Sequence, residues 1–245
     1  MRAEHARRAG HAVGLLLLLG LLPLLASAAR APVFLDPGPT GQALTGAVAV
    51  TGDAPLEAVL GDSVSWTYPA QTLRTGRGEP LWLRIHFRVI EPGRHLLLEL
   101  PTTALREVDF HGPFTTAGEP LQAPVHTGLH APYRTRPLGN ERAVMPLGIL
   151  APGDYRAYAR VQADLTHAVT PVAWDLRDYQ HWRAHKRLFD GICYGVLLTL
   201  LVYNLALTAV FRDQSYGYYV VACAFALLTL ATFNGHAAHY LWPAS

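Results

Sequence analysis

Two long uncharged runs near the end of the sequence constrain the fold more than any other feature. Residues 191–211 hold 21 residues without a charge, and residues 216–233 form a second such run. A transmembrane helix needs about 20 apolar residues, because it rises ~1.5 Å per residue through a hydrocarbon core of ~30 Å. The polar segment FRDQS separates the runs. Residues 191–245 are therefore predicted to form a hairpin of two membrane-spanning helices.

The first 28 residues have the three parts of an export signal. Arg2, Arg7 and Arg8 form a basic start, an apolar stretch follows, and residues 26–28 (ASA) fit the small-x-small cleavage pattern. The apolar stretch is too short to span a membrane, which favours a cleaved signal peptide over an uncleaved anchor. Either interpretation exports residues 29–178. We expect this domain in the periplasm or outside the cell, and the hairpin in the inner (cytoplasmic) membrane of a bacterium.

The exported segment has the pattern of an all-β domain. Along residues 81–89, apolar side chains occupy the odd positions, while the even positions carry Trp82, Arg84, His86 and Arg88. A period of two over nine residues predicts a half-buried strand. Further candidate strands have the same alternation or a short apolar run: 95–100, 106–112, and 155–161 after a Pro-Gly turn at 152–153.

The last candidate strand, residues 167–176, contains Pro171. A proline cannot donate to the ladder of a sheet, so this strand is expected at an edge or a bulge. Many short strands separated by Pro-Gly turns predict an antiparallel β-sandwich or jelly roll. The fold class is thus an all-β extracytoplasmic sandwich, then an amphipathic connector at residues 179–190, then the α-helical transmembrane hairpin.

Polar residues inside the hairpin carry further information. A polar side chain in hydrocarbon normally faces protein or water, so Asn204 is expected to bind a neighbouring helix in a larger bundle. Arg212 and Asp213 are expected to close the loop between the helices, with Asp213 at the start of the second helix. A role for this pair in passing a conformational signal is the alternative. Asn234 is expected to mark the end of the second helix.

The hairpin resembles the start of the seven-transmembrane region of the 7TMR-DISM family, bacterial receptors with diverse intracellular signalling modules. The resemblance covers about residues 191–243 and is carried by five short motifs: Tyr203-Asn204, Arg212-Asp213, Ser215-Tyr216, Asn234-Gly235 and Tyr240-Leu241-Trp242-Pro243. Residues 40–178 are similar to the type-2 extracellular domain of that family, over segments such as LWLRIHFRVIEPGRHLLLEL and TGLHAPYRTRPL.

The resemblance implies a sensor. Its parts would be an extracytoplasmic jelly roll related to carbohydrate-binding modules, seven helices, and a cytoplasmic output such as a histidine kinase, a diguanylate cyclase or a phosphatase. Because the sequence ends at Ser245, we expect this chain to be a portion truncated after the second helix. Its expected partners are a small molecule, with a sugar as the candidate, the lipid bilayer, and the further helices and output domain.

The candidate ligand site lies on the non-core face of the strand at residues 81–89. Trp82, Arg84 and His86 share that face, and Arg134 and Arg136 are expected to approach it from the segment YRTRP. An aromatic plate with arginines suits a sugar or a carboxylate. The alternative is that Trp82 packs under a loop while the arginines are solvated.

The sequence contains no nucleophile-elbow, Walker or dinucleotide-binding motif, so we expect neither an enzyme nor a cofactor. His181 and His185 lie four residues apart, but without a metalloprotease or CxxC pattern no metal site is predicted. A net charge of +2 gives no reason to expect a nucleic-acid partner. Two other classes stay open: an envelope scaffold that binds a protein, and a carbohydrate-active enzyme with a membrane tail.

Overall fold

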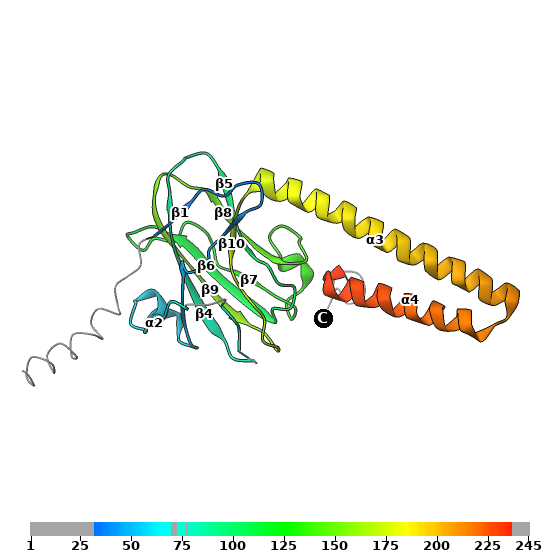
Figure 1. Cartoon of the computed structure of the whole chain (residues 1–245). Helices are drawn as coiled ribbons and strands as arrows, with labels where there is room; N and C mark the ends of the chain where they lie inside the picture. The colour runs from blue at the N-terminus through cyan, green and yellow to red at the C-terminus, as the bar shows by residue number, and fades with distance from the viewer. Residues whose placement is uncertain (1–31, 70–72, 77, 237–245) are drawn as a thin grey trace, which may run out of the picture. The chain divides into compact units, whose positions relative to one another are not determined.

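The computed structural model describes residues 32–69, 73–76 and 78–236 (Figure 1). The predicted signal peptide, residues 1–28, lies outside this part of the chain, as do Tyr240 and Trp242 of the family motif. The described residues form a β-sandwich followed by two long helices, as the sequence predicts.

The sandwich consists of two β-sheets. The first has the strand order β1-β4-β9-β6-β7, with β3 also paired to β4. Its strands are β1 (Val33–Leu35), β3 (Val48–Thr51), β4 (Leu81–Val89), β6 (Glu107–Phe114), β7 (Val125–Thr127) and β9 (Gly153–Gln162). The second has the order β2-β10-β5-β8. Its strands are β2 (Gln42–Ala43), β5 (His95–Leu100), β8 (Ala143–Ile149) and β10 (Val172–Asp175).

The core lies between the two sheets and follows the predicted alternation. Every second residue of β4 points inward, because successive side chains of a strand face opposite sides. Apart from Leu44, which follows β2, the largest fully buried side chains of this core come from four strands: Leu83, Ile85, Phe87, Leu96, Leu98, Leu100, Phe110, Met145 and Leu147. The strands predicted at residues 81–89, 95–100, 106–112 and 155–161 are confirmed as β4, β5, β6 and β9.

The outer face of the first sheet is partly covered by a short helix that the sequence did not predict. This helix, α2 (Leu56–Leu60), places Val59 beside Trp82 and Tyr158 in a second apolar cluster. Val59 and Trp82 are respectively 0% and 2% exposed. This face therefore has an apolar floor at one end, and further along β4 its outward positions carry the polar residues Arg84, His86 and Arg88.

The expected edge position of the last strand is wrong. Strand β10 pairs with β2 on one side and with β5 on the other, so it lies inside the second sheet. Pro171 precedes the first residue of β10, and its missing N–H therefore interrupts no ladder bond within the strand. The proline marks where the strand starts.

The predicted connector is the first third of a single helix. Helix α3 (Leu176–Phe211) has 36 residues and runs through positions 179–190 without a break. Asp175 caps its first turn by accepting a hydrogen bond from the Arg177 backbone N–H at 2.9 Å. Residues 176–190 contain neither proline nor glycine, so no helix-breaking residue separates the connector from the membrane-spanning part of α3.

The turn between the membrane helices has the predicted structure. Arg212 takes a left-handed conformation with φ 54° and its backbone N–H donates to Thr208 O. Asp213 then caps helix α4 (Gln214–Phe233), accepting from the Ser215 backbone N–H at 2.8 Å. This hydrogen bond holds the pKa of Asp213 below its usual range. A two-residue connection with a cap on each side accounts for these residues structurally.

Three further motif residues are placed by the hairpin. Asn234 caps the end of α4, as predicted. Tyr216 lies against Phe211, with ring centroids 6.2 Å apart across the turn. The Asn204 amide donates one hydrogen bond to Leu200 O in its own helix at 2.8 Å, and its expected contact with a further helix of the bundle stays a prediction. That bond satisfies one donor inside hydrocarbon without a partner helix.

The first prediction concerns the core. Phe110→Ala removes a ring that is 1% exposed between the sheets and should lower the free energy of unfolding by about 3–5 kcal/mol. Thermal or denaturant unfolding of the detergent-solubilised chain, followed by tryptophan fluorescence, measures the change. The control Ile149→Ala removes a side chain that is 67% exposed and should leave the midpoint nearly unchanged. Equal effects of the two substitutions would contradict the placement of the core.

Candidate functional site

A pocket of about 480 Å³ opens on the outer face of the first sheet, beside α2. Its lining combines one apolar wall with four polar side chains: Asp53, Ala54, Pro55, Leu56, Trp82, Asp109, His111 and Arg160. Such a mixture is typical of sites for small ligands, in which apolar surface surrounds a few polar groups.

Two of the polar side chains of the pocket, Arg160 and Asp109, come from one cross-strand row. Trp82 on β4 pairs with Arg160 on β9, and Arg160 pairs with Asp109 on β6. Asp109 in turn pairs with His126 on β7. Directly opposite residues on neighbouring strands lie about 4.5–5.5 Å apart, so the register alone brings these side chains together.

Ion pairs fix the arrangement of this row. Arg160 Nε donates to Asp53 Oδ1 at 3.1 Å, and one of its terminal nitrogens lies 3.7 Å from Asp109 Oδ2. The other oxygen of Asp109 is hydrogen-bonded to His126 Nδ1. The guanidinium therefore bridges two carboxylates, one from the sheet and one from the segment that leads to α2. Asp53 remains half exposed and accessible to a ligand.

Trp82 lines this pocket, but it is not the exposed plate that the sequence analysis expected. Its ring is 2% exposed, and its indole N–H donates to Ala54 O at 3.0 Å. It is buried, as the alternative interpretation held, but under the helix α2 rather than under a loop. The indole thus holds the Asp53–Leu56 wall of the pocket in place and offers little of its own surface to a ligand.

The neighbouring residues of β4 are occupied differently. Arg84 forms an ion pair with Asp62 and lies 4.4 Å above the ring of Trp66. His86 is one further step along the same face, paired with Arg156. Neither residue lines the pocket. Burial lowers the pKa of His86, and the nearby Arg156 charge lowers it further.

His111 lies inside the pocket next to Trp82, with ring centroids 5.8 Å apart. Burial lowers the pKa of His111, and this effect outweighs the raising influence of Asp109. The imidazole is consequently neutral at pH 7 and offers one donor and one acceptor.

The structure does not bring the two predicted loop arginines to this face. Arg136 stacks over Tyr133 at 4.9 Å, and its guanidinium donates to the backbone carbonyls of Asn140 and Glu141. Arg134 is exposed in the 3-10 turn η1 (Tyr133–Thr135). The hydrogen bonds of Arg136 therefore stabilise the loop to which it belongs.

The sequence analysis missed Asp53, Asp109, His111 and Arg160 as members of the site. Three of them are outward residues of strands that it did identify. Their grouping depends on the register between β9 and β6, which a single sequence does not reveal.

The sandwich is joined to α3 through a buried carboxylate. Glu99 on β5 is 1% exposed; it accepts from the Trp174 indole N–H at 2.8 Å and from Arg142 at 3.0 Å. The Trp174 ring then packs on Tyr179 and Trp182 of α3, with centroid distances of 5.5 and 5.3 Å. The first turns of the helix are therefore fixed to the outer face of the second sheet.

A second contact joins the sandwich to the end of α4. Gly235 has φ +77°, and a Cβ there would lie 3.1 Å from Glu141 Cβ and 3.2 Å from Thr103 Cγ2. Only glycine suits both the backbone conformation and this close approach. His236 Nε2 lies 3.7 Å from Glu141, and its Nδ1 is hydrogen-bonded to the Tyr194 hydroxyl at 3.0 Å. Both helices thus contact the sandwich near Glu141.

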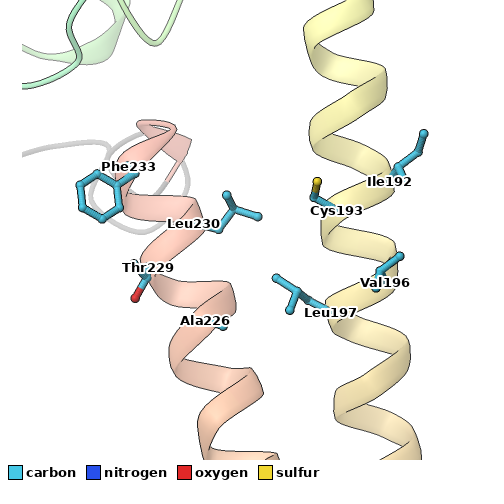
Figure 2. Close-up of a pocket in the computed structure, with 8 residues that line it drawn as sticks. All are labelled: Ile192, Cys193, Val196, Leu197, Ala226, Thr229, Leu230 and Phe233. Carbon is cyan, nitrogen blue, oxygen red and sulfur yellow. The ribbon is translucent and has the colours of Figure 1, made fainter.

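The two helices enclose an apolar groove of about 630 Å³ below these contacts. In Figure 2, Leu197 of α3 and Leu230 of α4 point toward each other across it. Both helices are long and apolar enough to cross a membrane, and their most apolar stretches are not buried within the described part of the chain. A hydrophobic surface of this extent requires lipid or further helices as its surroundings.

Two family models match the sequence. One, described as 7TMR-DISM extracellular 2, matches residues 54–175, which include β4 to β10. The other, described as 7TM diverse intracellular signalling, matches residues 186–245, which include most of α3 and all of α4. No curated protein matches the chain.

The second prediction concerns pH. A proton on His111 is disfavoured in the folded state relative to the unfolded state, where the pKa is about 6.5. Stability that is present above this value should therefore be lost as pH falls below it. His111→Gln should reduce the fall of the unfolding midpoint between about pH 7.5 and 5.5. The exposed loop residue His130, changed to Gln, is the control. An unchanged pH slope in His111→Gln would refute the burial argument.

Proposed function

We propose, from the premise that this chain belongs to the 7TMR-DISM family, that its sandwich binds a neutral sugar in the outer-face pocket and that α3 and α4 pass the occupancy to a cytoplasmic signalling module. The chain is the sensory portion of a membrane receptor, with an extracytoplasmic domain and membrane helices. The observation that carries the ligand proposal is the set Asp53, Arg160 and Asp109 beside Trp82 in one pocket.

Charge favours a neutral ligand over an organic acid. Two carboxylates, Asp53 and Asp109, face one guanidinium, and His111 is neutral at pH 7. The pocket therefore has a net negative charge, which repels a carboxylate or phosphate. The Arg160 guanidinium already has two anionic partners, Asp53 and Asp109.

A sugar matches the remaining chemistry of the pocket. Its hydroxyl groups both donate and accept, which suits two carboxylates, a guanidinium and a neutral imidazole side by side. Its apolar ring face can lie on Pro55 and Leu56, beside Trp82. Charged partners make these hydrogen bonds about twice as strong as neutral ones.

We propose binding without bond cleavage. Glycoside hydrolysis uses one protonated and one ionised carboxyl group. Asp53 and Asp109 are instead both paired with the Arg160 guanidinium, so neither stands apart as a separate acid or base. This arrangement supports a receptor rather than the carbohydrate-active enzyme that the sequence left open.

The relay is proposed to run through the two joints between sandwich and helices. Trp174 and Glu141 belong to the sandwich, and they contact α3 and the end of α4 respectively. A small shift between the sheets would move both helix ends together, and a ligand can bias such a shift only by its different affinity for two packings. The proposed setting is the inner membrane of a bacterium, with the sandwich in the periplasm.

The third prediction tests the ligand site. Arg160→Gln removes a charged hydrogen-bond donor and should weaken binding of a neutral sugar by about tenfold or more. Thermal-shift screening of the detergent-solubilised chain against sugars and organic acids finds the ligand, and titration calorimetry measures the affinity. Arg156→Gln is the matched control, because Arg156 lies on the same face of β9 outside the pocket.

Stabilisation by organic acids alone would reject the neutral-sugar assignment. If no small molecule stabilises the chain, the scaffold that binds a protein partner becomes the better reading. Equal loss of affinity in both arginine variants would move the site away from the pocket.

The fourth prediction tests the relay. The sequence has two cysteines, and Cys223→Ser leaves Cys193, which lines the groove between α3 and α4. Saturation with the sugar should change the rate of Cys193 alkylation by about fivefold. Trp182→Ala should remove this change while sugar binding persists, because it breaks the packing on Trp174. An alkylation rate that is unaffected by bound sugar would contradict the relay.

A further inference from the structure

A second polar cavity lies where the sandwich meets the outer ends of both helices. It measures about 570 Å³ and is lined by loop residues of the sandwich, by α3 between Tyr179 and Asp190, and by the end of α4. It is separate from the sugar pocket, with which it shares no residue.

The lining of this cavity is basic. Four cationic side chains face two acidic ones, which gives a net charge of +2: Arg142, Arg183, Lys186 and Arg187 against Glu141 and Asp190. Arg142 is committed to the buried Glu99, and Lys186 is paired with Asp190. Arg183 is 3.9 Å from Glu141, and its Nε is buried without a hydrogen-bond partner among the described residues. Arg183 and Arg187 therefore retain capacity for an anion.

The cavity lies at the level of the membrane surface. Asp190 is the last charged residue of α3 before the uncharged run, and Phe233 is the last residue of α4. Both helices enter the hydrocarbon layer immediately below. Trp182, on the cavity wall, is a residue type favoured at the boundary between headgroups and hydrocarbon.

The basic cavity continues into the apolar groove between the helices. Phe233 lines both, and below it the groove presents Ile192, Val196, Leu197 and Leu230 (Figure 2). A ligand that fills both spaces has an anionic head and a long apolar chain. The membrane itself supplies such molecules at this depth.

We propose that this continuous surface is a binding site for one anionic phospholipid of the leaflet facing the sandwich. Its phosphate would accept from Arg183 and Arg187, and one acyl chain would occupy the groove between α3 and α4. The lipid would thereby touch both joints that connect the helices to the sandwich. The lipid site requires only that the hairpin be in a membrane. It shares no residue with the sugar pocket, so a test of one site does not decide the other.

Native mass spectrometry of the detergent-purified chain with added lipid tests the site. We expect retention of one dioleoylphosphatidylglycerol per chain and about tenfold weaker retention of zwitterionic dioleoylphosphatidylcholine. The soluble headgroup glycerophosphoglycerol should not displace the lipid, because it cannot fill the groove. Displacement by this headgroup alone would show a simple phosphate site and overturn the proposal.

Two pairs of variants locate the bound lipid. Arg183→Gln with Arg187→Gln should reduce retention about tenfold. The matched double variant removes the same charge outside the cavity, at Arg177 and Arg156, and should retain the lipid. Equal loss in both would indicate non-specific charge attraction and refute the site. Because Arg183 also bonds the Gly139 carbonyl, Arg187→Glu alone repeats the test without that contact.

The groove is tested by filling it. Ala226→Phe places a ring among the groove residues and should abolish retention, whereas Ala224→Phe, outside the groove, should not. Retention that survives Ala226→Phe would refute the acyl-chain position. Retention that disappears when the chain is expressed with its following helices would identify a helix as the occupant and overturn the lipid site.

Discussion

The buried carboxylate of Glu99 is the contact on which the join between sandwich and membrane depends. A charge removed from water must be paired, or its desolvation destabilises the fold by several kcal/mol. Glu99 receives one hydrogen bond from Arg142 and one from Trp174, and so fixes the indole in a single orientation. That indole is the surface on which Tyr179 and Trp182 pack. A polar constraint inside the second sheet therefore determines where the first turns of α3 lie, although the contacts to the helix are mostly aromatic.

The two outer faces of the sandwich consequently differ in what they contact: one carries the polar pocket and the other packs against α3. The outer face of the first sheet carries a polar row across β4, β9, β6 and β7, with ion pairs that preorganise a pocket beside α2. The outer face of the second sheet packs against the first turns of α3, through Leu97, Val144 and Trp174. The core between them couples the two, because close-packed interiors transmit strain rather than absorb it. Binding on one face can thus bias the packing on the other.

The sequence predicted five strands (β4, β5, β6, β9 and β10) and both membrane helices, but neither the other five strands that the structure describes, nor α2, nor the grouping of side chains across strands. Alternation along β4 and β9 fixed which side chains face the core, and uncharged length identified both membrane helices. Local chemistry also located the Asp213 cap. The site was harder, since Arg160 and Asp109 become neighbours only through strand register, and Trp82 is covered by a helix of five residues. Arg136 was wrongly predicted to face the ligand. Its guanidinium donates hydrogen bonds to carbonyls of its own loop, and a sequence does not distinguish such an arginine from one that binds a ligand. The family resemblance, which both family matches confirm, rests on motifs and was independent of these errors.

Helix α3 is continuous from the second sheet to the turn at Arg212, and this continuity has a mechanical consequence. Its 36 residues amount to about 54 Å of unbroken helix. A rod of that length acts as a lever: a tilt of about 5° at the Trp174 end displaces the far end by roughly 5 Å, close to one helical turn. Rearrangements too small to disturb the sandwich core are thereby magnified at the cytoplasmic surface.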